Sequence, residues 1–161
     1  MYGHCAREVW ENTMKMLRNA ALLAVACSFA LPAGARDEQK RYPITQALRS
    51  PAAQGRIDPG IRLFFGRQPH PNVTKDFGQW PTNKKTNVFA KSDLQACEWV
   101  FLSAVIALQE RARKQGGNAV IDIVSNYRNI VTSSESEYVC GAGNLIAGVA
   151  LKGRVVNVSG R

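Results

Sequence analysis

The clearest pattern of apolar and polar positions lies between Ser92 and Gly117, and it predicts a long helix. Apolar residues recur there at spacings of three and four, as on one helical face: Leu94, Cys97, Phe101, Ala104, Val105, Leu108 and Ala112. The opposite side is expected to carry Glu98, Gln109, Arg111 and Lys114. Ser92 and Gln95 have the spacing of a capping box, and Gly116-Gly117 is typical of a helix end.

The segments around this helix have the patterns of strands. Before it, residues 61–65 predict a short strand, and the polar, proline-containing residues 77–89 predict an irregular or edge strand. After it, residues 119–127 are rich in β-branched side chains, and residues 137–158 form an extended pattern that ends in a Gly- and Val-rich strand or pair of strands. There, Gly141, Gly143 and Gly148 indicate bulges or close backbone packing. The expected fold class is α+β, with one main helix packed on a small, mostly antiparallel sheet.

The remaining segments are shorter. Residues 36–41 are a charged leader that we expect to be loose, and residues 43–48 predict a short helix with Pro43 in its first turn. Residues 66–73 hold His70 between two prolines and predict a loop. The polar residues 132–136 predict a hairpin loop.

The first 35 residues have the features of a secretory signal peptide in the usual order. Lys15 and Arg18 precede an apolar run over residues 20–31, and Ala33-Gly34-Ala35 fits a small-residue cleavage site. The run is shorter than the roughly 20 apolar residues that span a bilayer. We therefore expect cleavage near Ala35, a periplasmic or secreted protein, and no transmembrane segment in its mature form.

Alternatives to this interpretation remain open. Residues 20–31 fit an N-terminal core helix as well, although the charges that follow argue against it. Lipidation at Cys27 is a second alternative, because Ala24-Val25-Ala26-Cys27 loosely resembles a lipoprotein signal. Met14 or Met16 is the expected true start, since Lys15 then lies where a signal peptide carries its charge.

Residues 36–161 are then a single domain of 126 residues, long enough for one hydrophobic core. They contain 18 lysines and arginines against 10 aspartates and glutamates, a net charge of +8. The basic residues are scattered and form no basic helix or aromatic-interleaved stripe, so nucleic acid is not an expected partner. Of the four cysteines only Cys97 and Cys140 remain, and an oxidising compartment favours a disulfide between them. Two free buried thiols are the alternative.

Four segments carry a resemblance to known proteins: residues 82–87 (TNKKTN), 91–104 (KSDLQACEWVFLSA), 117–125 (GNAVIDIVS) and 147–153 (AGVALKG). Through them the chain resembles, over most of residues 36–161, a family of small exported proteobacterial proteins. The helix, the following strand and the Gly-rich last strand are also similar to the YbjQ-type domain, which is named for heavy-metal binding. They resemble more distantly the envelope stress sensor RcsF, which has two disulfides where residues 36–161 have cysteines for one. The resemblance implies the α+β fold and suggests a sensor or adaptor as an alternative function.

Members of the first family are often labelled as an excinuclease ATPase subunit, and the sequence excludes that role. Such a subunit needs a phosphate-binding loop of the form G-x-x-x-x-G-K-[ST]. Gly148 and Gly153 have the spacing, but Arg154-Val155 stands where the motif requires Lys and Ser or Thr. Two cysteines also supply no zinc module, which takes four Cys or His ligands.

No set of residues predicts catalysis. A nucleophile needs an oriented base, and His70 is the only histidine of residues 36–161. Asp93 and Glu98 lie near the start of the helix, where carboxylates commonly stabilise the helix dipole. Metal binding through Cys97, Cys140 and His70 is an alternative function, although an oxidised cysteine pair offers no thiolate ligand.

We therefore expect an exported binding or interaction module of the cell envelope, not an enzyme, with no cofactor and no bound metal. Its expected partner is an envelope protein or an anionic envelope component. The candidate contact residues are Lys84, Lys85 and Asn87 in the polar run, and Trp99 on the helix. A solvated turn at Lys84-Lys85 and a partly buried Trp99 are the ordinary alternatives.

Overall fold

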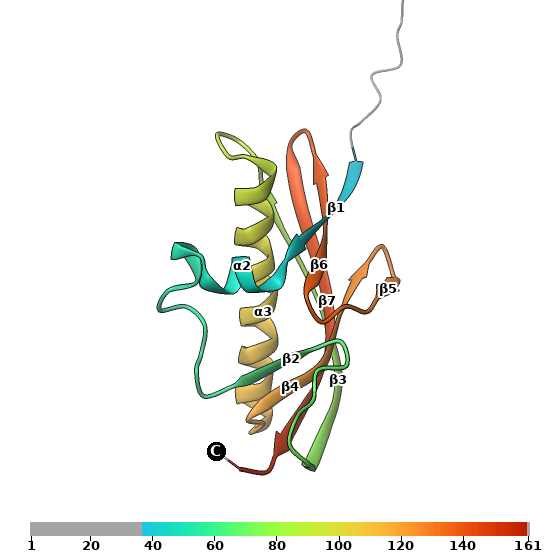
Figure 1. The fold of residues 1–161 in the computed structure, drawn as a ribbon. Coiled ribbons are helices and arrows are strands. Elements are labelled where there is room, and N and C mark those ends of the chain that lie inside the picture. The colour runs from blue at the N-terminus through green and yellow to red at the C-terminus, as the bar shows by residue number, and fades with distance from the viewer. Residues whose placement is uncertain (1–36, 161) are drawn as a thin grey trace, which may run out of the picture. The chain divides into compact units, whose positions relative to one another are not determined.

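The computed structural model describes residues 37–160, which form one seven-stranded sheet with a long helix across one of its faces (Figure 1). The elements in chain order are β1 (Asp37–Pro43), α2 (Ile44–Arg49), a 3₁₀ turn (Pro51–Ala53), β2 (Arg62–Phe65), β3 (Val73–Asn87), α3 (Asp93–Gln115), β4 (Ala119–Tyr127), β5 (Ile130–Thr132), β6 (Glu137–Gly143) and β7 (Ile146–Val158). The predicted α+β fold with one main helix is confirmed.

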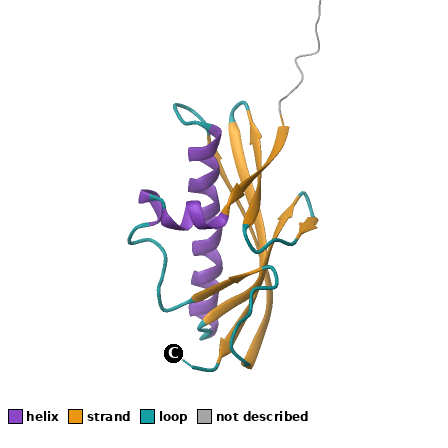
Figure 2. Ribbon diagram, viewed as in Figure 1, coloured by secondary structure: helices purple, strands orange, loops and turns teal. Residues whose placement is uncertain are grey.

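Strand β7 is the centre of the sheet. It pairs with β3 along one edge, and along the other edge it pairs first with β6 and then with β4. Strand β1 extends the sheet beyond β6, while β2 and β5 both pair with β4. Every pairing is antiparallel except that of β2 with β4, so the sheet is mostly antiparallel, as predicted (Figure 2).

Helix α3 begins and ends as its sequence predicts. The Ser92 hydroxyl accepts a hydrogen bond from the Gln95 backbone N–H at 3.2 Å, and the Gln95 side chain accepts one from the Ser92 N–H at 3.0 Å. Gly116 ends the helix in the left-handed conformation, at φ 76°. Six of the seven apolar residues that predict the helical face are buried, and Leu94 is half-buried. This face packs against alternate residues of β7: Ala147, Val149, Leu151 and Val155.

Two expectations about single segments are wrong. Residues 37–43 are not a loose leader but strand β1, because they pair with β6 through a register that places Lys40 opposite Cys140.

Gln109 does not lie on a solvent-facing side of the helix. It is 2% exposed, and its amide accepts a hydrogen bond from the Asp58 N–H and donates to the carbonyls of Asp58 and Ile61. A buried amide of this kind needs partners, and the loop before β2 supplies them.

Several expectations concern other parts of the chain. The signal peptide, the cleavage site at Ala35, lipidation at Cys27 and a start at Met14 or Met16 all fall outside the described residues. Strand β3 begins at Val73, four residues before the predicted edge strand, and the short strand β5 was not expected. Among residues 37–160, no helix is long and apolar enough to cross a membrane.

Candidate functional site

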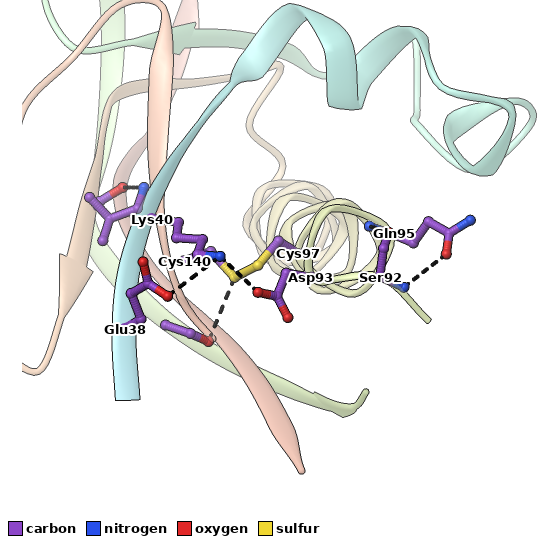
Figure 3. The surroundings of a disulfide bond; sticks show 10 residues. Glu38, Lys40, Ser92, Asp93, Gln95, Cys97 and Cys140 are labelled. Carbon is purple, nitrogen blue, oxygen red and sulfur yellow. Dashed lines mark hydrogen bonds and ion pairs between the residues drawn. A yellow bond between two sulfur atoms is a disulfide. The ribbon is translucent and has the colours of Figure 1, made fainter. Parts of the chain in front are cut away.

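A disulfide joins the main helix to the sheet. Cys97, in α3, is bonded to Cys140 of β6, with 5.9 Å between their Cα atoms (Figure 3). Both residues are fully buried. The prediction of this disulfide is confirmed, and the bonded sulfurs offer neither a nucleophile nor a thiolate for a metal.

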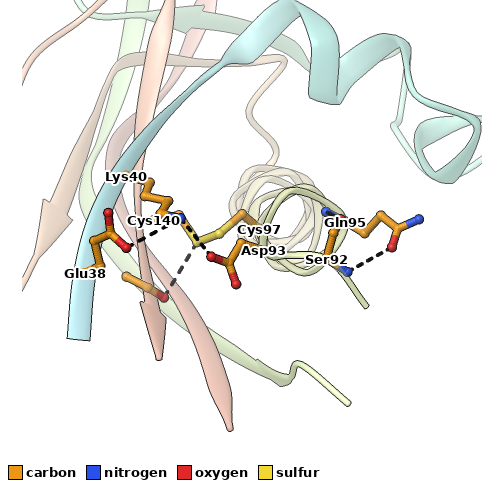
Figure 4. A network of polar contacts seen from close by, with 8 residues as sticks. Glu38, Lys40, Ser92, Asp93, Gln95, Cys97 and Cys140 are labelled. Carbon is orange, nitrogen blue, oxygen red and sulfur yellow. Dashed lines mark hydrogen bonds and ion pairs between the residues drawn. A yellow bond between two sulfur atoms is a disulfide. The ribbon is translucent and has the colours of Figure 1, made fainter. Parts of the chain in front are cut away.

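A polar bridge from β1 to the start of α3 lies beside the disulfide. The Lys40 ammonium is 2.9 Å from Asp93 Oδ2 and 3.5 Å from Glu38 Oε2 (Figure 4). Asp93 occupies the first turn of α3, where a carboxylate is also stabilised by the helix dipole. Lys40 therefore links β1 to the first turn of α3, next to the disulfide that links the helix to β6.

The two predicted contact lysines lie on opposite faces of the sheet. In β3, Lys84 is paired with Val149, which belongs to the core under α3. Lys85 is paired with Gly148 and points to the face that α3 leaves open, because successive strand residues alternate between faces. Lys84 and Lys85, which are adjacent in the sequence, therefore contribute positive charge to two different surfaces.

The other two candidate contact residues lie elsewhere. Asn87 ends β3, and its side-chain oxygen is 3.3 Å from the Lys91 ammonium. Trp99 is 46% exposed on α3, and the Arg56 guanidinium carbon lies 4.3 Å from its ring centroid. The structure thus does not gather Lys84, Lys85, Asn87 and Trp99 into one site.

The open face of the sheet carries a groove of about 590 Å³. Its floor consists of small residues, Gly141 and Gly148 with Ala150. Tyr127 and Lys85 are among the residues along its sides. The groove also includes the tip of the β6–β7 hairpin, where Leu145 is 78% and Ile146 53% exposed.

At position 141 of this floor only glycine fits, whereas position 148 would accept a Cβ atom. A Cβ atom on Gly141 would lie 1.8 Å from the Tyr127 hydroxyl oxygen, so Tyr127 packs on the strand only because position 141 has no side chain. A Cβ atom on Gly148 would meet its neighbours no closer than 3.7 Å, which is ordinary van der Waals contact. Position 148 therefore accepts a Cβ atom without a clash, and the predicted close packing at the β6 and β7 glycines is found at Gly141.

Sequence reasoning marked Gly141 and Gly148 but missed Tyr127, which ends β4. Tyr127 reaches Gly141 of β6 although the two strands only border the same central strand at different points. The signal that would have found it is the combination of an aromatic residue at a strand end with paired glycines on neighbouring strands.

Ionisable groups in residues 37–160 show no catalytic arrangement. The Tyr138 hydroxyl has no hydrogen-bond partner within residues 37–160, and burial raises the pKa of this group far above its usual value, with smaller contributions from Glu98 and Tyr42. The Arg113 side chain and the Gly60 N–H lower the pKa of Asp58, a surface carboxylate. His70 lies exposed on its loop, with Nδ1 2.9 Å from the carbonyl oxygen of Pro71.

Metal binding gains no support from residues 37–160, where no three His, Cys, Asp or Glu side chains are grouped to hold an ion. No family model, curated protein or solved structure matches the chain. The resemblance to the exported family, to the YbjQ-type domain and to RcsF stays a prediction.

Proposed function

We propose that the protein is an exported, non-catalytic binding module of the cell envelope that holds a partner protein in the groove on its open sheet face. One observation carries the proposal: a hollow of about 590 Å³ lies on the sheet face that α3 does not cover. Hollows of this size with apolar walls and a few polar groups are typical of binding sites.

The lining of the groove indicates the chemistry of the partner. Gly148, Ala150 and the exposed hairpin residues Leu145 and Ile146 offer an apolar surface. Lys85 adds positive charge, and none of the lining residues that the structure describes is acidic. The occupant that fits is a protein segment with apolar side chains and a nearby carboxylate, because complementary charge favours encounter and register.

Export is supported by the disulfide between Cys97 and Cys140. A disulfide is typical of proteins in oxidising compartments, since cytosolic reductants keep most thiols reduced.

The groove is tested with a photo-crosslinking amino acid placed at Ile146 and, as control, at the exposed Gln54 on the helix side. The amino acid at position 146 is expected to crosslink to one partner protein. Mass spectrometry is expected to locate the crosslink in a segment of that partner with apolar side chains and a nearby carboxylate. Gly148→Leu, which fills the hollow, and Lys85→Glu, which reverses its charge, are expected to abolish that product. Equal crosslinking from Ile146 and Gln54, or crosslinking that survives both substitutions, would reject the groove.

Export is tested by intact-mass analysis of the protein from the envelope fraction, with and without reduction before alkylation. The expected mass is that of a chain beginning at Arg36. This chain is expected to take up two alkyl groups only after reduction. A chain that still begins at its start codon, with both thiols open to alkylation, would show that the export proposal is wrong.

A further inference from the structure

A second hollow lies on the other side of β3, between this strand and the C-terminal half of α3. Its volume is about 260 Å³. Strand β3 contributes Trp80, Thr82 and Lys84, and α3 contributes Arg111 and Lys114. Because the two elements are held together by the core, the side chains around this cleft are brought to one place by the fold and not by the sequence alone.

The cleft concentrates positive charge. Lys84, Arg111 and Lys114 line it together with one carboxylate, that of Glu110. Within residues 37–160, none of the three cations takes part in an ion pair of the structure. An unneutralised group of cations from two elements attracts an anion from solution.

The guanidinium of Arg111 is held in a defined orientation. Its central carbon lies 4.1 Å from the centroid of the Trp80 ring. Arginine stacked on an aromatic face keeps the N–H donors at its edge, in a fork that matches two oxygens of a phosphate or carboxylate. Trp80 therefore positions Arg111 for a bidentate anion contact.

Thr82 supplies an independent observation. Its hydroxyl oxygen is buried and has no hydrogen-bond partner among the described residues. The register of β3 pairs Thr82 with Leu151, a core residue under α3, so the side chain points to the same face as the cleft. A buried hydroxyl without a partner is unfavourable, and rotation of the Thr82 side chain toward the cleft would let an oxygen of a bound anion satisfy it.

The end of α3 opposes an anion only weakly. The C-terminus of a helix carries about half a negative charge, whereas the three cations and Glu110 sum to two positive charges. The cleft is also smaller than the roughly 300 Å³ at which pockets for drug-sized ligands begin. The arrangement suits a small, highly charged group better than a whole organic molecule.

We propose that the α3–β3 cleft binds the phosphoryl group of a phosphate ester. A phosphoryl group has three or more acceptor oxygens, enough for the Arg111 fork, the two ammonium groups and the Thr82 hydroxyl together. The group comes either from a soluble phosphate or from an anionic lipid headgroup. The cleft and the open-face groove share Asn83 of β3, but they use different lysines: Lys84 lines the cleft and Lys85 lines the groove.

Neighbouring lysines provide the matched test. The full chain is titrated with inorganic phosphate at constant ionic strength, and binding is followed by calorimetry. Lys84→Gln and Arg111→Gln are each expected to weaken binding about tenfold, because each removes a charge-assisted hydrogen bond. Lys85→Gln, with the same change of charge one residue away, is expected to leave binding unchanged. Equal weakening by the two lysine substitutions would indicate diffuse attraction and reject the cleft.

Vesicles distinguish the two sources of the group. Binding to phosphatidylglycerol vesicles, absent with phosphatidylcholine and weakened by Lys84→Gln but not by Lys85→Gln, would identify a lipid headgroup. Binding of inorganic phosphate without vesicle binding would identify a soluble phosphate. Binding of neither probe would overturn the proposal.

Thr82→Val separates a ligand contact from a structural role. Valine has nearly the same shape but no hydroxyl, so phosphate or vesicle binding is expected to weaken several-fold. The melting temperature of the free protein is expected to stay the same or rise, because the buried hydroxyl has no partner to lose. A fall in melting temperature with unchanged binding would show that the hydroxyl stabilises the fold and takes no part in the site.

Discussion

The two faces of the sheet differ although they are built from alternate residues of the same strands. On the α3 face, β7 contributes Val149, Leu151 and Val155 to the core, and β6 contributes the disulfide. On the open face, the same strands contribute Gly148, Ala150 and Gly141. One face is filled with side chains, and the other is kept nearly bare around the groove, although Ala119, Ile121, Val156 and Val158 form a second buried cluster on it farther along the strands.

This difference between the faces means that residues important for stability and residues available for recognition lie on opposite sides of the sheet. Substitutions on the filled face change the free energy of unfolding, because close-packed cores respond to single methylene groups. Substitutions on the bare face change the shape and charge of the groove with little effect on the core. The two surfaces are therefore open to separate experiments, and the following predictions test how separate they are.

The largest effect is expected from removal of the disulfide. The double substitution Cys97→Ala, Cys140→Ala releases a loop with a sequence separation of 43 residues. The chain-entropy model gives a loss of about 3–4 kcal/mol in the free energy of unfolding. Urea unfolding of both proteins measures it, and oxidised and substituted chains of equal stability would contradict it.

Two glycines of β7 test the comparison directly. A Cβ on Gly153 would lie 2.7 Å from Val120 Cγ1 on the filled face, whereas one on Gly148 would make ordinary contacts on the bare face. Gly153→Ala is expected to cost about 1–3 kcal/mol through overpacking. Gly148→Ala is expected to be neutral or to stabilise by about 0.5 kcal/mol, by restricting the unfolded chain. If chemical denaturation shows equal losses for both, the faces do not differ as we describe.

Gln109 tests whether a buried amide on α3 contributes more to stability than an exposed amide on β3. Gln109→Leu leaves backbone groups of Asp58 and Ile61 without their partner, at an expected cost of about 1–3 kcal/mol. Gln79→Leu serves as the control, because Gln79 is exposed on β3. Thermal unfolding of both variants measures the difference, and similar melting temperatures would show that the buried amide contributes nothing.

The smallest effect is expected at the Asp58–Arg113 ion pair on the surface. The hydrogen bond from Arg113, with a further one from the Gly60 N–H, lowers the pKa of Asp58 below its usual range. A carboxylate with a lowered folded-state pKa stabilises the protein above its unfolded pKa, and this contribution is lost as the pH falls through the folded value. Asp58→Asn is expected to lower stability slightly at neutral pH and to flatten the decline below about pH 4. Parallel acid titrations of unfolding would contradict this.

The predictable part of the fold is the local part. Helix α3 follows from its capping box and its apolar spacing, because both act within a few residues. Strand β1 does not, because charged residues form a strand there only by pairing with β6 about a hundred residues later. Gln109 was misplaced for a similar reason, since its partners Asp58 and Ile61 come from a distant loop.

The candidate site shows the same limit. The sequence marked the Lys84-Lys85 pair and the glycines, but not that β3 separates two hollows with one lysine in each. The groove depends on the approach of Tyr127 to Gly141, and the cleft depends on the stacking of Arg111 on Trp80. Each contact joins residues from different elements, and no spacing within one segment encodes it.

Strand β3 has a consequence for the behaviour of the protein in concentrated solution. It is 15 residues long and, among residues 37–160, pairs only with β7, so its outer edge presents free backbone groups. Such an edge is a template for pairing between molecules and for aggregation. Pro81, two irregularities of register and the exposed lysines along the strand interrupt that template. The same basic residues that line the two hollows therefore also oppose edge-to-edge pairing of β3 between molecules.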